Sequence, residues 1–138
     1  MLERILVPID GTEYSWRALE YAAALAKLSG GSLVIMTVAQ RELFSTAVIQ
    51  QGDCLVAQIG DEVLDAARAV LSGSGIPASY LLEKGGNIAE HILRAEKTEK
   101  CDAIVLGSRG FGMLEGLFKN SVSQVIVENA DVPVTIVK

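Results

Sequence analysis

A glycine-rich segment between residues 107 and 123 holds the residues best suited to chemistry. It reads GSRGFGMLEGLFKNSVS, with four glycines followed by Ser121 and Ser123. Glycine permits positive φ and lets the main chain approach an anion closely, and the amides at the start of a helix attract negative charge. The segment therefore predicts a cradle for phosphate. An ordinary loop with glycines, followed by a helix with a serine cap, would have the same sequence. The pattern alone therefore does not decide between a phosphate-binding segment and such a loop.

The same letters exclude two common phosphate-binding motifs. No Gly-Lys-Ser or Gly-Lys-Thr closes the segment, so it is not a Walker P-loop. The first apolar run of the chain is not followed by GxGxxG, so the dinucleotide-binding fingerprint is absent as well.

Asp10 is the second candidate for a functional residue. It follows the apolar run RILVPI and precedes Gly11. An Asp-Gly pair after a strand is commonly a turn, whereas a carboxylate at a strand end can also hold a ligand. The pair alone does not decide between these two roles.

The remaining polar residues favour no catalytic site. The single histidine, His91, lies between Glu90 and Arg94 on the expected polar face of a helix, where we expect it to be exposed and without a role. The acidic residues Asp61, Glu62 and Asp65 are expected to form a solvated helix face, so any metal ligands stay unknown. Nucleophilic catalysis needs a Ser or Cys beside a base, and no such pair is evident, so we expect no dedicated enzyme.

The apolar runs predict the elements that must position these residues. Short β-prone runs predict strands over residues 4–9, 32–39, 78–83, 102–106 and 132–137. Helical spacing of apolar residues predicts helices over 13–28, 55–71, 88–100 and 121–128, the first capped by Thr12 and the third by Asn87. The order βαβαβαβαβ indicates one α/β domain over residues 1–138, an open Rossmann-like sheet of five parallel strands with helices on both faces. Ligands of such sheets bind outside the carboxyl ends of the strands, where both candidate segments fall.

Composition narrows the classes of partner. The chain has 138 residues, half of them hydrophobic, and a net charge of -5, which argues against a broad nucleic-acid surface. No apolar stretch approaches the roughly 20 residues of a membrane span, and the first residues, MLERILVPID, lack the pattern of a signal peptide. We therefore expect a cytoplasmic protein without a membrane partner. Cys54 and Cys101 are far apart in the sequence and are expected to be buried thiols.

Three segments resemble the universal stress protein family: PIDGT after the first strand, GSRGFG after the fourth, and NSVSQVIVENADVPVTIVK to the end. The ATP-binding members of that family carry Gly-x2-Gly-x9-Gly-Ser/Thr. Gly107, Gly110 and Ser121 match this spacing, and Asn120 stands in place of the last glycine. Gly85 also matches a glycine that the family often shows.

The resemblance implies a site for ATP accompanied by Mg2+. Adenine would lie near Pro8 and the backbone of Val38, and Asp10 near the ribose or a metal. The phosphates would be held by two stretches, namely Gly107, Ser108, Arg109, Gly110, Phe111 and Gly112, and then Asn120, Ser121, Val122 and Ser123. The resemblance also implies a homodimer formed through the last strand, from Pro133 to Val137.

These observations favour a stress-response regulatory protein that binds an adenine nucleotide. Two alternatives stay open: a dimeric interaction module of the same family that binds no nucleotide, and a slow ATP hydrolase.

Asn120 generates a first testable prediction. Asparagine tolerates left-handed geometry better than other non-glycine residues, so Asn120→Gly should raise the affinities for ATP and for AMP equally, by about tenfold or less. Isothermal titration calorimetry of both proteins measures this. A large gain for ATP alone would show instead that the asparagine side chain occupies the place of the terminal phosphate.

Overall fold

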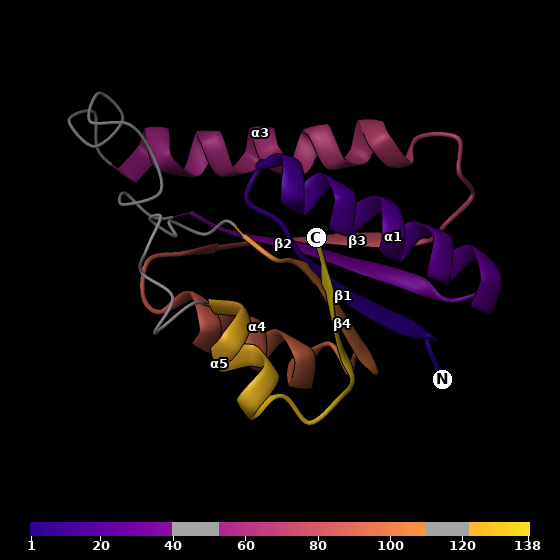
Figure 1. The fold of residues 1–138 in the computed structure, drawn as a ribbon. Helices are drawn as coiled ribbons and strands as arrows, with labels where there is room; N and C mark the ends of the chain where they lie inside the picture. The colour runs from indigo at the N-terminus through magenta and orange to yellow at the C-terminus, as the bar shows by residue number, and fades with distance from the viewer. Residues whose placement is uncertain (40–52, 110–121) are drawn as a thin grey trace.

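The computed structural model describes residues 1–39, 53–109 and 122–138. Nine elements follow one another in strict alternation within these residues (Figure 1). They are β1 (Arg4–Pro8), α1 (Glu13–Ser29), β2 (Ser32–Ala39), α3 (Asp53–Leu71), β3 (Ala78–Lys84), α4 (Ile88–Thr98), β4 (Ala103–Gly107), α5 (Val122–Asn129) and β5 (Val134–Val137). The expected single α/β fold with a five-stranded parallel sheet is confirmed.

The strands lie in the order β3-β2-β1-β4-β5, and all described pairs are parallel. The chain moves outward from β1 to β2 and β3, and then returns to the other side of β1 for β4 and β5. The strand order therefore reverses between β1 and β4. In open α/β sheets this reversal leaves a crevice at the carboxyl ends of the two strands.

Two helical layers cover the sheet (Figure 1). On one face α1 and α3 pack against Ile5, Val7 and Ile35, and on the other α4 and α5 pack against Leu6, Val34 and Met36. Successive side chains of a strand point to opposite faces, so the alternating residues of β1 and β2 divide between two cores. This explains why both strands read as continuous apolar runs.

Small residues bring α1 close to the sheet. Ala18, Ala22 and Ala26 recur every four residues along its buried face and are at most 1% exposed. The helix begins at the expected cap, because the Thr12 hydroxyl accepts a hydrogen bond from Ser15 N, and it ends at Gly30 in left-handed geometry.

Some boundaries differ from the expected ones for identifiable reasons. The last strand begins at Val134 instead of residue 132, after Pro133, which cannot donate to a ladder. The fourth begins at Ala103, because the Asp102 carboxylate accepts hydrogen bonds from the backbone amides of Glu3 and Arg4. The first ends at Pro8, although Ile9 N still donates to Met36 O over 2.8 Å. No helix among the described residues is long and apolar enough to cross a membrane.

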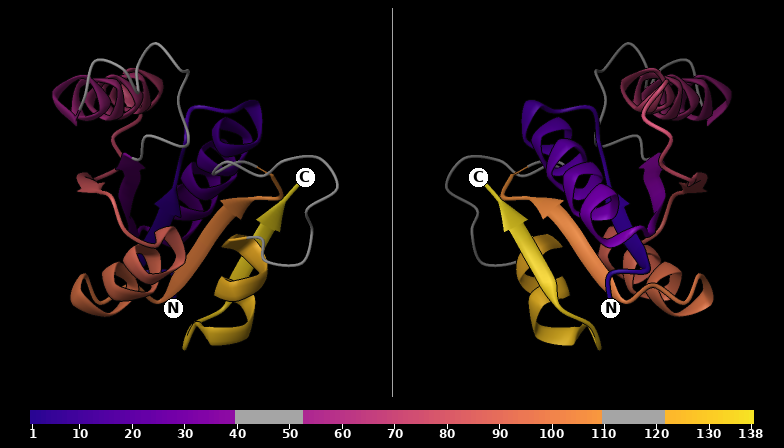
Figure 2. Two further views of the ribbon diagram at one scale, coloured as in Figure 1. Left: turned by 90° about the vertical axis from the view of Figure 1, so that its left-hand side faces the viewer. Right: turned by 90° about the vertical axis from the view of Figure 1, so that its right-hand side faces the viewer.

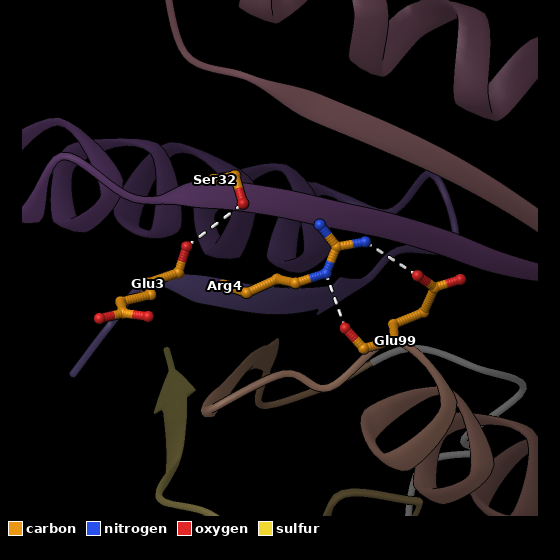
Figure 3. Close-up of polar contacts among 4 residues, drawn as sticks. All are labelled: Glu3, Arg4, Ser32 and Glu99. Atoms are coloured by element: carbon orange, nitrogen blue, oxygen red, sulfur yellow. Dashed lines mark hydrogen bonds and ion pairs between the residues drawn. The ribbon is translucent and has the colours of Figure 1, made fainter.

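Arg4 ties the amino end of the sheet to the end of α4 (Figure 3). Its Nε donates to the Glu99 carbonyl oxygen over 2.7 Å, and one terminal nitrogen pairs with the Glu99 carboxylate over 2.8 Å. Next to it, the Ser32 hydroxyl donates to the Glu3 carbonyl oxygen over 3.2 Å. A guanidinium at the carboxyl end of a helix also interacts favourably with the helix dipole. Three elements, β1, β2 and α4, are therefore joined at this corner.

Cys101 lies beside this corner and is a buried thiol, as expected. It is 6% exposed, and burial raises its pKa to about 11. Because the thiolate is the reactive form, Cys101 is a packing residue at neutral pH. The side chain of Cys54 lies outside the described residues.

Arg4→Met should lower the free energy of unfolding by about 1–2 kcal/mol, because it removes two charge-assisted hydrogen bonds of a half-buried group. Urea denaturation measures this. Arg17→Met is the matched control: its partner Glu13 forms an exposed pair within one helix, so the loss should stay near about 0.5 kcal/mol or less. Equal losses in the two variants would contradict the structural role given to Arg4.

Candidate functional site

The candidate residues of β1 and β4 meet at the carboxyl edge of the sheet. Pro8 ends β1 and is buried, and Gly107 ends the neighbouring β4. Asp10 and Ser108 follow these ends directly. The structure therefore brings four expected site residues from two distant parts of the sequence to the point where the strand order reverses.

Asp10 forms the turn that begins α1. Its Oδ1 accepts hydrogen bonds from Thr12 N over 3.0 Å and from Thr12 Oγ1 over 2.6 Å, and Gly11 takes a φ of 86°. The turn expected from the Asp-Gly pair is therefore present. Asp10 is half-buried just beyond the carboxyl end of β1, where the strand order reverses, so the turn also fixes a negative group there.

Gly107 is required by packing against the first turn of α1. A Cβ atom at this position would lie 2.8 Å from the Tyr14 carbonyl oxygen and 2.9 Å from its carbonyl carbon. The next residue, Ser108, donates its backbone N–H to Val137 O over 2.8 Å. The chain leaving β4 is thus held between α1 and β5.

Arg109 lies over the same turn of α1. Its guanidinium carbon is 5.8 Å from the centre of the Tyr14 ring, and that of Arg17 is 5.5 Å from it. Cation–π contacts of this length hold an exposed arginine weakly, by about 0.5–1 kcal/mol. Arg109 is therefore a positive group at the edge of the site that can reorient.

The backbone of Val38 presents hydrogen-bonding groups to the crevice. The β1–β2 register ends at the pair Pro8 and Met36, whereas β2 continues to Ala39 along β3. Backbone groups of successive strand residues point to alternate sides. Met36 O accepts from Ile9 N on the β1 side, so the N–H and C=O of Val38, two residues later, face the same side beyond the end of β1.

Other expected site residues lie partly or wholly outside the described residues. Val122 begins α5 and packs half-buried against the α4–α5 core, and Ser123 follows it, also half-buried. Gly110, Phe111, Gly112, Asn120 and Ser121 lie outside the described residues. Within the described residues no group of three His, Cys, Asp or Glu side chains could hold a metal ion.

The expectation that His91 is exposed is wrong. Its side chain is 13% exposed, and its Nε2 donates to the Gly85 carbonyl oxygen over 2.7 Å. No spacing pattern indicates this contact, because it arises where Gly85 and Gly86 both take positive φ and turn the chain back toward the helix.

The whole chain, residues 1–138, matches the sequence model of the universal stress protein family. The chain belongs to that family. Among curated relatives of the family, a universal stress protein of Thermus aquaticus is 31% identical over 142 residues, and the match covers 100% of both chains. The universal stress protein YxiE of Bacillus subtilis is 29% identical over 149 residues, again with complete coverage of both chains.

Solved structures of the family share the fold. The universal stress protein UspA from Lactobacillus plantarum superposes with a TM-score of 0.80 at 21% identity, and the match covers 99% of this chain and 98% of that one. A universal stress protein in complex with cAMP gives a TM-score of 0.76 at 19% identity, covering 99% and 97% of the two chains. A family protein from Arabidopsis thaliana with AMP bound gives 0.70 at 15% identity, covering 98% and 90%.

Gly107→Ala should lower the free energy of unfolding by about 1–3 kcal/mol, because the new methyl group meets main-chain atoms of α1 that cannot rotate away. Thermal or urea denaturation measures the loss. Ser108→Ala keeps the amide that bonds Val137, so its unfolding free energy should stay within about 0.5 kcal/mol of wild type. A fully stable Gly107→Ala variant would show that α1 and β4 can separate.

Proposed function

We propose that this universal stress protein is a regulatory protein that binds an adenine nucleotide in the crevice between β1 and β4. The observation that carries the proposal is the backbone edge of Val38, which faces this crevice beyond the end of β1. A peptide N–H and C=O side by side match the acceptor N1 and the amino group of adenine. Family members with cAMP and with AMP bound support the same class of ligand.

The other residues of the crevice fit the rest of a nucleotide. Pro8 is buried at the end of β1, opposite Met36, which is two residues before Val38, and would give an apolar floor there. The Asp10 carboxylate can accept hydrogen bonds from ribose hydroxyls. Gly107, Ser108 and Arg109 begin the segment that would receive the phosphates, and Ser123 lies in the first turn of α5, where helix amides favour anions. ATP is the proposed ligand, with Mg2+ neutralising the phosphates.

The proposed output is a nucleotide-dependent interaction and not a reaction. The partners that the structure gives to the His91 ring are the Gly85 carbonyl oxygen and the Glu83 carboxylate, and neither is a Ser or Cys nucleophile. Phosphate transfer needs a group that positions the attacking water. The described part of the crevice presents Asp10, which is already engaged by Thr12.

Asp10→Asn tests the proposal without breaking the turn, because the amide oxygen can still accept both hydrogen bonds from Thr12. We expect affinity for adenine nucleotides to fall about tenfold, as for the loss of a charged acceptor, with an unchanged melting temperature. Calorimetric titration with ATP, ADP and AMP measures the affinity. Asp61→Asn, on the exposed face of α3, is the control and should bind as wild type.

The same titration separates the alternatives. If the wild-type protein binds no nucleotide at millimolar concentration, the result supports the alternative of an interaction module that binds no nucleotide. Release of phosphate from ATP that disappears in Asp10→Asn would indicate a hydrolase.

We further propose that the protein forms a homodimer by pairing of two β5 strands. β5 is an edge of the sheet, next to β4 (Figure 2). The Pro133 and Val137 carbonyl oxygens face β4, since they accept from Ile104 N and Ser108 N. By alternation, the backbone groups of Val134 and Ile136 face outward, and exposed edges of this kind invite pairing.

Ile136→Pro should convert the dimer to a monomer. It removes an outward N–H from the edge and leaves the bonds between β4 and β5 in place, and proline is tolerated on edge strands. Sedimentation at micromolar concentration measures the state, and Ile136→Val is the control that keeps the N–H. A monomeric wild type, or a proline variant that dimerises as well as wild type, would contradict this pairing.

A further inference from the structure

The turn between β3 and α4 is closed by a partly buried histidine. Gly85 and Gly86 take φ values of 63° and 71°, and Asn87 caps α4 by accepting a hydrogen bond from Glu90 N over 3.0 Å. From the first turn of that helix the His91 ring returns to the glycines. A carbonyl oxygen only accepts, so Nε2 carries the hydrogen that bonds Gly85 O over 2.7 Å.

The His91 ring lies close to Gly86 and Glu83. A Cβ atom on Gly86 would lie 3.3 Å from Nε2, and the second ring nitrogen lies 3.7 Å from the Glu83 carboxylate. The second nitrogen is buried and has no hydrogen-bond partner among the described residues. His91 is therefore held between the end of β3 and the two glycines.

Gly85 is fixed on both of its backbone groups. Its N–H donates to Ala39 O over 3.0 Å, which adds a bond beyond the paired strand residues Ala39 and Lys84. Its C=O accepts from His91. Glycine has more backbone freedom than other residues. The contact with the His91 ring therefore keeps Gly85 in the orientation in which its N–H bonds the carbonyl oxygen of Ala39, the last residue of β2.

Val38 precedes that anchored residue and presents its backbone to the other side, toward the β1–β4 crevice. Beyond Met36 the described ladder of β2 continues along β3 alone, so the hydrogen bonds to β3 and to Gly85 restrain the backbone of this strand end. Glu83 pairs with Val38 in the β2–β3 register, so the residues around His91 and those of the crevice belong to the same end of the sheet.

We infer that His91 is a positioning residue for base recognition: through Gly85 and Ala39 it fixes the Val38 backbone at the spacing that adenine requires. This inference rests on the proposed binding of adenine nucleotides. Adenine offers an acceptor at N1 and an amino donor, whereas guanine offers an N–H donor and a carbonyl acceptor at the corresponding positions. A fixed peptide edge distinguishes the two bases, and a loosened one distinguishes them less.

The test compares His91→Leu, which removes the donor, with His91→Gln, whose amide nitrogen can occupy the place of Nε2. Arg94→Leu, exposed one turn further along α4, is the control. Affinities for AMP and GMP are measured by calorimetry, and amide exchange of Gly85 and the melting temperature are measured in the free proteins.

We expect His91→Leu to weaken AMP binding about threefold to tenfold, the worth of one hydrogen bond, with GMP binding unchanged. The Gly85 amide should exchange faster by a similar factor. His91→Gln should restore both quantities to within about twofold of wild type, and Arg94→Leu should change neither. A role in stability alone would lower the melting temperature and leave the ratio of AMP to GMP affinity as in wild type.

Two results would overturn the inference, and they are distinguishable. If wild type binds AMP and His91→Leu binds it equally well with the same preference over GMP, nucleotide binding stands and the role of His91 falls. If wild type binds neither nucleotide, the proposed function fails and base positioning fails with it.

Discussion

The complete burial of the middle of β1 is the constraint on which the rest of the structure depends. Ile5, Leu6 and Val7 are 0% exposed, because two strands and two helical layers surround them. None of these three side chains can meet a ligand. Functional groups have to come from beyond the strand ends, and the reversal of strand order determines which ends lie together.

This constraint favours the binding of a ligand by backbone N–H and C=O groups. Val38 is 1% exposed, and its apolar side chain belongs to the core on the α4–α5 face, yet its peptide groups face the crevice. Gly107 has no side chain, and Gly85 acts through both of its backbone groups. In the proposed site, the specificity for the ligand therefore depends more on the positions of backbone N–H and C=O groups than on the types of the side chains.

Much of the fold could be predicted from the sequence because local and global signals agree. Apolar runs buried on both faces, the Thr12 and Asn87 caps and the glycine stop after α1 each act within a few residues, and the structure confirms them. The expected convergence of Asp10 and Gly107 at one edge also appears, because parallel strands align their carboxyl ends. These features need no knowledge of distant contacts.

The features that sequence reasoning missed depend on distant or conformational partners. The apolar run predicts that Asp102 begins a strand, but its carboxylate accepts hydrogen bonds from the amides of residues 3 and 4, almost a hundred positions away. The helical pattern predicts an exposed His91, because nothing in the sequence shows that two glycines with positive φ bring a carbonyl oxygen to its ring. Backbone partners of this kind leave no spacing pattern to read.

One hydrogen bond joins the two proposed activities of the protein. Ser108, in the segment proposed to receive phosphates, donates its N–H to Val137 at the end of β5, the strand proposed to pair in the dimer. Ligand contacts that move Ser108 change the geometry of this bond, and pairing of β5 restrains it from the other side. Coupling between two binding equilibria is reciprocal, so a nucleotide that strengthens the dimer must itself bind more tightly to the dimer than to the monomer. In the proposed function this hydrogen bond would be the link through which occupancy of the nucleotide site alters the surface offered to partners.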